Sequence, residues 1–541
     1  MSINKVKNSS SLFTVVGGGI SGLSTAYYLS KLLKASSNQS SQKITLIEGS
    51  DRFGGYIRSE SHSLPDGTSV LYEKGPRTLR LGKSNEALAT LDLIDDLKLH
   101  DKVLFTKKSA PSSKNRFIYY NNKINLAPSS PKQLMSLFSP VMRPVVYGVL
   151  KDIFSPKNSQ PNQTDEPLSK FIARRFGSKV DDRLTSAVLA GIYASDTNDL
   201  STRMIFNTAW KAEQLSGHVL FGLKKAVKQK KLKLNNIPLL KTIGDMEVDA
   251  HAKRMSSNHS FWENANSSSI FSFDDGLQTL SNSILSYLKS AGNVDIISKD
   301  PCDVKVLLSS GSEVQSSRVI NTVPLYASRS FFGDDGQNLN IFNHTRYTSI
   351  CLVNLTFKKE SVAQVPGFGF LVPRDEWANI GIIGIVFDSS CLPGQDKGND
   401  IVRFTVMMGG PTFKIQFSDP SSQKPENLKE MAIKAIKKAL IIKDDPIHCD
   451  SNVLNNCIPI YHPNYYEDLS SLHKWLTSWN KSLSVAGACF GGPGINAIVL
   501  NTKYLAYNHM LSIDPSVLNS GSNSPEPLPS CTGLEHILAL Y

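Results

Sequence analysis

The sequence predicts a mixed α/β fold, and three observations near the N-terminus support this prediction. Residues 12–16 are apolar and β-prone, a glycine cluster follows them, and a helical pattern then runs from Ser21 to about Leu33. After a polar stretch, residues 43–48 form a second short apolar run. A buried strand, a glycine turn, a helix and a second strand, in this order, are the first half of a Rossmann-type dinucleotide fold.

The turn between the first strand and the helix matches the pattern G-x-G-x-x-G. Gly17 permits a tight turn, Gly19 lets the backbone approach a pyrophosphate, and Gly22 allows the helix to pack closely on the strand. The first amides of a helix are unpaired and lie at the positive end of its dipole, where phosphates bind well. We therefore assign the phosphates to the residues of this turn, which are Gly17, Gly18, Gly19, Ile20, Ser21 and Gly22.

The end of the second predicted strand indicates which dinucleotide is bound. Glu48 can accept hydrogen bonds from both hydroxyls of a ribose, and its charge would repel the 2′-phosphate of NADP. Arg52-x-Gly54-Gly55 follows, an extension that distinguishes FAD-binding oxidases from NAD dehydrogenases. Arg52 can pair with a phosphate, and the glycine pair lets the backbone pass beside an extended flavin. These residues predict FAD.

Two later segments fit the same site. Residues 73–77 supply another tight turn, which we expect near the isoalloxazine ring. Close to the C-terminus, residues 485–488 form a strand, and the glycine-rich residues 491–494 lead into a helix. A helix N-terminus at this place can stabilise negative charge on a reduced flavin.

Composition limits the remaining possibilities. The chain has 541 residues, more than one ordinary domain needs, and carries a net charge of +12 with scattered lysines. We see no nucleic-acid-binding motif, and the seven cysteines show no disulfide or metal spacing, so we expect reduced thiols. No run of 18 apolar residues occurs, and the roughly eleven residues before the first strand are too few for a typical targeting peptide.

The rest of the chain contains further regular elements and polar connections. We expect a surface loop over 155–168, a solvated and irregular insert over 224–260, and a Ser/Pro-rich tail after about 512. The predicted strands are 317–323, 350–357, 382–388, 401–409 and 483–490, and a helix is predicted over 426–441.

With these residues in view, the chain resembles the oxygen-dependent protoporphyrinogen oxidases of the fungal mitochondrial type, within the amine oxidase and phytoene desaturase superfamily. The similarity runs from Val15 to Ala506. The dinucleotide turn is generic to the superfamily. The more specific stretches are 55–59, 73–80, 191–193, 367–373, 384–389 and 457–459.

The resemblance implies an activity and a cofactor. Protoporphyrinogen IX would undergo a six-electron oxidation, FAD would carry the electrons, and O2 would accept them to form H2O2. One FAD per chain would be held non-covalently, because no Ser-Gly-Gly-Cys attachment motif is present. The resemblance adds to the FAD site Tyr56, Ile57, Arg58, Gly75, Pro76, Arg77, Cys302, Ala486, Gly487, Gly494, Ile495 and Asn496.

The resemblance also implies substrate contacts. Arg116 matches an arginine that pairs with a substrate propionate, although without the resemblance the sequence favours an ordinary surface residue after a Ser-rich loop. Leu371 and Val386 match apolar walls of the macrocycle pocket and are also compatible with strand-core positions. Gly191 matches a backbone position near the substrate. No residue is assigned as general base.

The implied architecture has three parts and a membrane contact. The apolar residues 134–154 are expected to lie in the membrane interface as a monotopic contact, on the intermembrane-space side of the mitochondrial inner membrane. Arg143 and Lys151 would reach acidic lipid, and the apolar face would consist of Met135, Leu137, Phe138, Val141, Val145, Val146, Val149 and Leu150. Ferrochelatase and a second copy of the chain are further implied partners, and nucleic acid is not. The expected divisions are an FAD-binding domain of 1–92, 265–330 and 478–541, a substrate-binding domain of 93–122, 211–264 and 331–477, and a helical membrane-contacting domain of 123–210.

Three residues depart from the family pattern, and rival functions share the flavin motifs. Asp275 stands where the family usually has glycine, Ala497 where it often has aspartate, and Thr502 where it often has glycine. The rivals are a polyamine or monoamine oxidase, a carotenoid desaturase, and a flavin-bound scaffold without catalytic activity.

Overall fold

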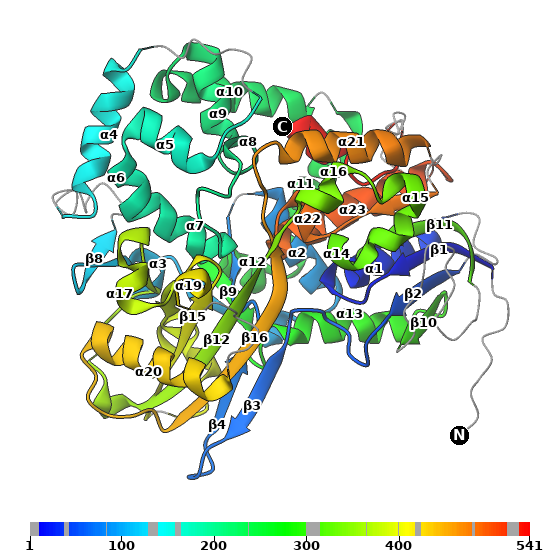
Figure 1. Ribbon diagram of the computed structural model, residues 1–541. Helices are drawn as coiled ribbons and strands as arrows, with labels where there is room; N and C mark the ends of the chain where they lie inside the picture. The colour runs from blue at the N-terminus through cyan, green and yellow to red at the C-terminus, as the bar shows by residue number, and fades with distance from the viewer. Residues whose placement is uncertain are drawn as a thin grey trace.

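A computed structural model (Figure 1) shows how these segments are arranged. It describes residues 10–36, 43–82, 84–127, 139–156, 164–235, 237–298, 314–363, 365–398, 400–416, 424–478, 482–514, 516, 528 and 530–541.

The first sheet is the parallel sheet that the N-terminal sequence predicts. Its five strands run in the order β10-β2-β1-β11-β17, and every neighbouring pair is parallel. After β1 and β2, the chain therefore returns to this sheet from two distant regions, residues 294–321 and 483–485. The strands are β1 (Ser10–Val16), β2 (Ile44–Glu48), β10 (Val294–Ser298), β11 (Gln315–Asn321) and β17 (Leu483–Val485).

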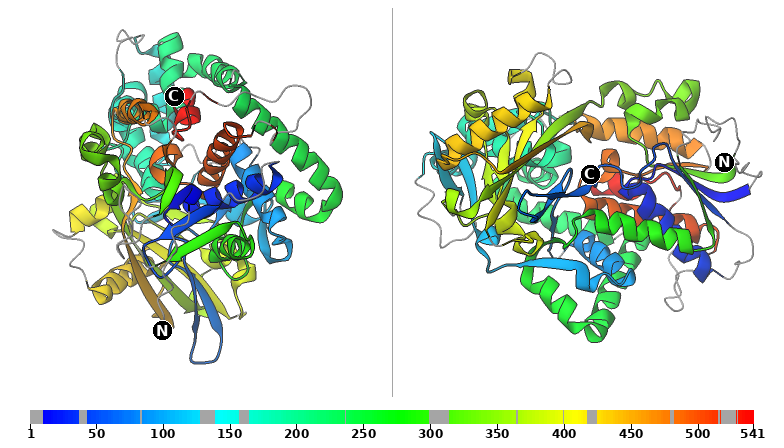
Figure 2. Two further views of the ribbon diagram at one scale, coloured as in Figure 1. Left: turned by 90° about the vertical axis from the view of Figure 1, so that its right-hand side faces the viewer. Right: turned by 90° about the horizontal axis from the view of Figure 1, so that it is seen from below.

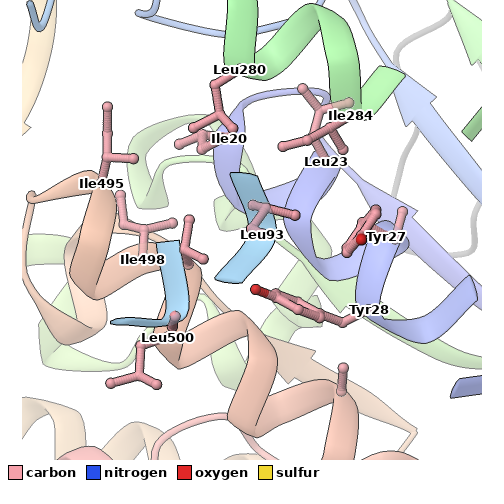
Figure 3. Packing of buried hydrophobic residues seen from close by; sticks show 14 of the residues in the cluster. Ile20, Leu23, Tyr27, Tyr28, Leu93, Leu280, Ile284, Ile495, Ile498 and Leu500 are labelled. Atoms are coloured by element: carbon pink, nitrogen blue, oxygen red, sulfur yellow. The ribbon is translucent and has the colours of Figure 1, made fainter. Parts of the chain in front are cut away.

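Three helices pack together beside this sheet and form its largest core. They are α1 (Ile20–Ala35), α13 (Gln278–Ser290) and α23 (Ile495–Leu511). Figure 3 shows Ile20, Leu23 and Tyr27 of α1 next to Leu280 and Ile284 of α13, with α23 on the other side. Thirteen of the sixteen residues of α1 are buried, so its position is fixed by packing on nearly all sides.

The second sheet has seven strands in the order β16-β12-β15-β14-β13-β7-β8. Its neighbours are antiparallel except for the parallel pair of β13 and β7. In the right-hand view of Figure 2, its yellow strands lie to the left and the dark blue N-terminal strand to the right. The strands are β7 (Arg116–Tyr120), β8 (Lys123–Ala127), β12 (Tyr347–Lys358), β13 (Gly369–Leu371), β14 (Gly384–Val386), β15 (Ile401–Gly409) and β16 (His448–Pro459).

Smaller sheets and the remaining helices complete the chain. The small sheets are formed by β3 (Ser59–Ser63) with β4 (Ser69–Glu73), and by β5 (Leu79–Arg80), β9 (Ser268–Phe273) and β6 (Val103–Lys107). The helices up to residue 267 are α2 (Asn85–Asp96), α3 (Pro111–Lys114), α4 (Arg143–Phe154), α5 (Leu168–Phe176), α6 (Ser178–Val180), α7 (Ser186–Tyr193), α8 (Thr202–Ile205), α9 (Asn207–Ser216), α10 (Val219–Asn235), α11 (Pro238–Ser257) and α12 (His259–Ser267). The later helices are α14 (Leu325–Ser328), α15 (Gly333–Gly336), α16 (Asn340–His344), α17 (Trp377–Ile380), α18 (Asp388–Cys391), α19 (Pro411–Gln416), α20 (Pro425–Leu440), α21 (Tyr465–Ser478), α22 (Ala488–Gly491) and α24 (Glu535–Leu540).

The sequence prediction about one polar segment is wrong. The lysine-rich insert 224–260 is helical, since α10 and α11 occupy most of it, and in the left-hand view of Figure 2 these green helices run along one side of the molecule. Gly222 lets α10 pack directly on α9, because an added Cβ would lie 1.9 Å from the carbonyl oxygen of Ala212. Arg254 holds α11 to α2 through ion pairs with Asp95 and Asp96 at 3.3 and 3.1 Å. The Ser/Pro-rich tail ends in the helix α24.

Several predicted boundaries shift. The strand predicted over 382–388 is shorter and gives way to α18, and the strand predicted over 483–490 stops at Val485, where α22 soon follows. Within the apolar stretch 134–154, the described helix α4 begins only at Arg143, after a turn that buries Val141. Met135, Leu137 and Phe138 lie outside the described residues.

Candidate functional site

The two N-terminal glycine motifs lie side by side. The Gly17 amide donates to the carbonyl of Ile47 at 2.8 Å, which fixes the turn at the end of the parallel sheet. The Gly54 amide donates to the carbonyl of Gly18 at 2.8 Å, and Gly19 forms a parallel bridge with Gly54. The second motif thus forms a wall beside the start of α1.

The glycines of this turn differ in what surrounds them. A Cβ on Gly22 would lie 1.7 Å from the carbonyl oxygen of Gly17, and one on Gly18 would lie 2.5 Å from the Phe53 ring. A Cβ on Gly19 would meet only the Cα of Gly55, at 3.9 Å. Gly22 and Gly18 are therefore required by the protein's own packing, whereas Gly19 faces open space.

The start of α1 fits an anionic group. Gly19 is its N-cap, no side chain caps the helix, and its first turn carries no acidic residue. The terminal amides of a helix favour a phosphate when no protein side chain has taken them. The open space at Gly19 and the uncapped amides together form the cradle that a dinucleotide pyrophosphate requires.

Glu48 is held at the end of β2 by the protein itself. One carboxylate oxygen accepts from the Gly18 amide at 2.6 Å, and the other accepts from the amide and hydroxyl of Ser50 at 2.8 Å. A carboxylate has about four acceptor positions, so hydrogen bonds from a ribose remain open to it. The ribose role of Glu48 stays a prediction with suitable geometry.

Arg52 holds the loop that follows it. Its guanidinium donates to the carbonyl of Ile57 at 2.9 Å, to that of Phe53 at 3.2 Å, and to that of Gly55. Burial and the nearby Arg58 lower the pKa of Arg52. These backbone contacts shape the 53–57 loop, a role that the sequence interpretation missed, and a direct phosphate contact stays a prediction.

Residues 73–77 pack beneath the same loop. A Cβ on Gly75 would lie 2.0 Å from the carbonyl oxygen of Tyr56, so only glycine allows this approach. Arg77 forms a buried ion pair with Asp388 at 3.1 Å. Burial raises the pKa of Glu73 to about 7, against hydrogen bonds from Ser59 and the Leu277 amide that lower it. The two segments are therefore in direct contact, and the place of residues 73–77 near an isoalloxazine ring stays a prediction.

The C-terminal glycine segment joins this region from the opposite end of the chain. The Ala486 amide donates to the carbonyl of Asn321 at 3.0 Å, and a Cβ on Gly487 would lie 3.5 Å from the hydroxyl of Ser21. Gly494 is the N-cap of α23, with no side-chain cap and no atom near its added Cβ. Asn496 donates to the carbonyl of Arg80 at 2.8 Å.

The site thus contains two uncapped helix starts, one from each end of the chain. The remaining residues assigned to FAD, Ile20, Pro76 and Ile495, lie within these segments, and Cys302 lies outside the described residues.

The predicted substrate residues come together from neighbouring strands of the second sheet and from helix α7. Arg116 begins β7, whose next residues pair with Phe370 and Leu371 of β13. Val386 lies opposite Gly369, where β14 pairs with β13. Gly191 of α7 is in direct contact with Leu371, because an added Cβ would lie 2.5 Å from its side chain.

Arg116 is partly buried and sits over an aromatic ring. Its guanidinium carbon lies 4.7 Å from the centre of the Phe368 ring, a cation–π arrangement. Burial, and next the charge of Arg80, lower the pKa of Arg116. Sequence reasoning did not single out Phe368 or Arg80, although both lie in the family-specific stretches. Val386 is only 5% exposed and belongs to a core cluster. Of its two expected roles, the structure shows the strand-core position.

Comparison with known proteins identifies the family. A family model described as flavin containing amine oxidoreductase matches residues 20–496. The protoporphyrinogen oxidase of Schizosaccharomyces pombe is 32% identical over 499 residues, covering 90% of this chain and 96% of the relative. That of Bos taurus is 29% identical over 501 residues, covering 91% and 97%. The mitochondrial protoporphyrinogen oxidase of Nicotiana tabacum is 26% identical over 490 residues, covering 85% and 87%.

Solved structures show the same fold. A candidate protoporphyrinogen oxidase from Exiguobacterium sp. 255-15 has a TM-score of 0.68 at 18% identity, covering 94% of this chain and 99% of its own. Reduced UDP-galactopyranose mutase has a TM-score of 0.60 at 13% identity, covering 94% and 97%. The family match covers the whole second sheet and every strand of the first sheet except β1, and its description as flavin containing agrees with the FAD predicted from the sequence. The chain therefore belongs to the flavin-containing amine oxidoreductases and is an FAD-dependent oxidoreductase.

Proposed function

We propose that this chain oxidises protoporphyrinogen IX to protoporphyrin IX, with FAD as its redox group and O2 as the electron acceptor, producing H2O2. The observation that carries the proposal is the Schizosaccharomyces pombe relative, which bears the name of this activity and aligns with 90% of the chain. The residues that the resemblance assigns to the substrate also lie on adjacent elements, which supports the proposal.

The chain's own residues would bind and orient the reactants. When bound, FAD supplies the hydride chemistry. The uncapped start of α1 would hold its phosphates, and the uncapped start of α23 would favour negative charge on its ring. Leu371, backed by Gly191, would form part of an apolar wall against the macrocycle, while β7 presents Arg116 to a propionate.

Two arginines suit a substrate with two carboxylates. Arg80 is exposed at the end of β5, and its charge acts on Arg116. Two positive charges near one another repel, and a dianionic ligand bound between them would offset this repulsion. We propose that Arg80 belongs to the same propionate-binding region as Arg116.

The rival functions have less support. The putrescine oxidase structures are 11% identical and show the fold alone. The departures that favoured a non-catalytic scaffold are compatible with an intact site: Asp275 is exposed, and Thr502 hydrogen-bonds to Ser24 at 2.9 Å in the contact between α1 and α23. The neighbouring Gly276 supplies the positive φ of 87° that this turn needs.

Anaerobic mixing tests the proposed activity. Under anaerobic conditions, protoporphyrinogen IX is expected to bleach the visible flavin band of the purified enzyme rapidly, because the cofactor must accept the substrate's electrons. Putrescine and a monoamine, at matched concentrations, should leave the band unchanged on the same timescale. Rapid bleaching by an amine and none by protoporphyrinogen would instead identify an amine oxidase.

We further propose a peripheral membrane contact through α4. No helix in the described part of the chain is long and apolar enough to cross a membrane. One side of α4 nonetheless leaves large apolar side chains in solvent, and α10 beside it adds Phe221, which is 59% exposed. The exposed residues of α4 are Val146, Tyr147, Val149, Leu150 and Phe154.

The residues that could reach a bilayer are not all those that the sequence predicts. Val141 is only 2% exposed and Val145 packs against a core cluster, so neither belongs to the contact face. Arg143 and Lys151 are exposed on the same helix and could each contribute about 1 kcal/mol near an anionic surface. The intermembrane-space side of the inner mitochondrial membrane, contact with ferrochelatase and a homodimer rest on the resemblance and stay predictions.

Changing the exposed face of α4 tests the membrane proposal. The variant Val146→Ser, Val149→Ser and Leu150→Ser is expected to bind anionic vesicles more weakly than wild type in a sedimentation assay, because insertion buries apolar area. Ile441→Ser, at a site 84% exposed beyond α20, is the control and should bind like wild type. If moderate salt releases the wild-type protein completely, the contact is electrostatic and apolar insertion is wrong.

A further inference from the structure

A pocket of about 730 Å³ lies apart from the cradle, between the end of α16 and the start of α21. The two helices lie next to each other in Figure 1. Three side chains of types that bind transition metals line this pocket: His344 at the end of α16, His462 before α21, and Asp468 in its first turn. They have no part in the proposed oxidation.

The spacing of these three groups suits a tetrahedral metal ion. His344 Nδ1 lies 3.0 Å from Asp468 Oδ2, and His462 Nε2 lies 3.4 Å from the same oxygen. One ligand atom from each residue lies within 4.8 Å of the other two. Zinc with bonds of 2.0–2.1 Å separates neighbouring tetrahedral ligands by about 3.3 Å. Little movement is needed to bring the ligands around one ion.

His462 supplies an independent indication of a ligand. Its Nδ1 lies 2.9 Å from the carbonyl oxygen of Pro463, which can only accept, so Nδ1 carries the proton of this contact. The residue is 8% exposed, yet its Nε2 makes no hydrogen bond to any residue that the structure describes. A buried imidazole whose other nitrogen is fixed by a backbone carbonyl is typical of a metal ligand.

The other charged side chains that line the pocket are paired with residues outside the cluster. Arg346 lines it but is paired with Asp199 at 2.7 Å, and Glu467, also in the lining, is paired with Arg203 at 2.7 Å. A second cluster consists of Glu60, His62 and Asp450. Its two carboxylates already have a cationic partner, because Lys74 forms ion pairs with both Glu60 and Asp450. The pocket at α16 is therefore the better candidate.

We propose that His344, His462 and Asp468 bind one divalent transition-metal ion of the zinc type, with water from the pocket completing the coordination. The ion would fasten the end of α16 to the start of α21. Tyr461 and Tyr465, in the same segment, donate to the carbonyls of Ala488 and Cys489 in the C-terminal glycine segment. The site is thus a structural clamp behind one wall of the FAD cradle.

Zinc binding to the FAD-loaded full chain tests the proposal. Untagged holoenzyme, stripped with a chelator and desalted, is titrated with ZnCl₂ in a calorimeter, and the bound metal is counted by mass spectrometry. We expect one zinc per chain and a higher Tm with zinc, because an ion that binds only the folded state stabilises it. His344→Ala should weaken binding at least about 10-fold, since loss of even an outer-shell partner costs that much.

Matched variants keep the result interpretable. His344 is half exposed, so its replacement is not expected to disturb folding, and an unchanged ratio of flavin to protein absorbance would verify this. Asp468→Asn is the second ligand variant, and His259→Ala, at a site 74% exposed elsewhere, is the control that should bind like wild type. Binding below half a zinc per chain, or equal affinity in His344→Ala and wild type, would overturn the metal site.

Discussion

Gly19→Asp is expected to yield a folded protein that contains no FAD. The folded chain offers space for a side chain here, because an added Cβ meets only the Cα of Gly55 at 3.9 Å. That space is where the uncapped amides of α1 would receive the pyrophosphate, so a carboxylate would both fill it and repel the phosphates. We expect normal far-UV circular dichroism, colourless protein and no oxidase activity.

Two neighbouring positions distinguish loss of cofactor from loss of fold. Gly19→Ala should retain part of its FAD with weakened affinity, since it adds volume without charge. Gly22→Ala should instead impair folding and yield, because its Cβ would lie 1.7 Å from the Gly17 carbonyl oxygen. A Gly19→Asp protein that purifies with stoichiometric FAD would show that the pyrophosphate lies elsewhere.

Arg116→Ala is expected to lower kcat/KM for protoporphyrinogen IX by about 10- to 150-fold while FAD content stays normal. A charge-assisted hydrogen bond to a carboxylate contributes roughly 1.5–3 kcal/mol, which corresponds to this range. Arg116 is partly buried and stacked on Phe368, so its guanidinium is already oriented before substrate arrives. Steady-state kinetics with fluorescence detection of protoporphyrin measures the effect.

Arg116→Lys separates charge from geometry. Lysine keeps the positive charge but cannot form the bidentate pair, so its kcat/KM should fall between those of wild type and Arg116→Ala. With an esterified substrate that has no free propionates, wild type and the two variants should differ little in kcat/KM. Equal KM and kcat for wild type and Arg116→Ala would remove Arg116 from the substrate site.

The glycine turn and the elements that flank it could be predicted from the sequence because their determinants are local. Gly17 has a φ of 107°, and Gly22 lies against the Gly17 carbonyl. Both positions therefore require glycine because of residues that are near in the sequence. The elements β1, α1 and β2 also form close to their predicted places. The helices α10 and α11 were missed because contacts with α9 and α2, rather than apolar periodicity, stabilise them.

The sequence by itself therefore determined the α/β class, the glycine turns at both ends of the chain and the flavin they predict. Short-range backbone geometry specifies these features. Only the tertiary structure decided which apolar residues near α4 stay exposed, how Arg116 meets Phe368, and that His344 lies beside His462 and Asp468. Such contacts join segments far apart in the chain, and their formation depends on the packing of whole sheets and helices, which no local pattern encodes.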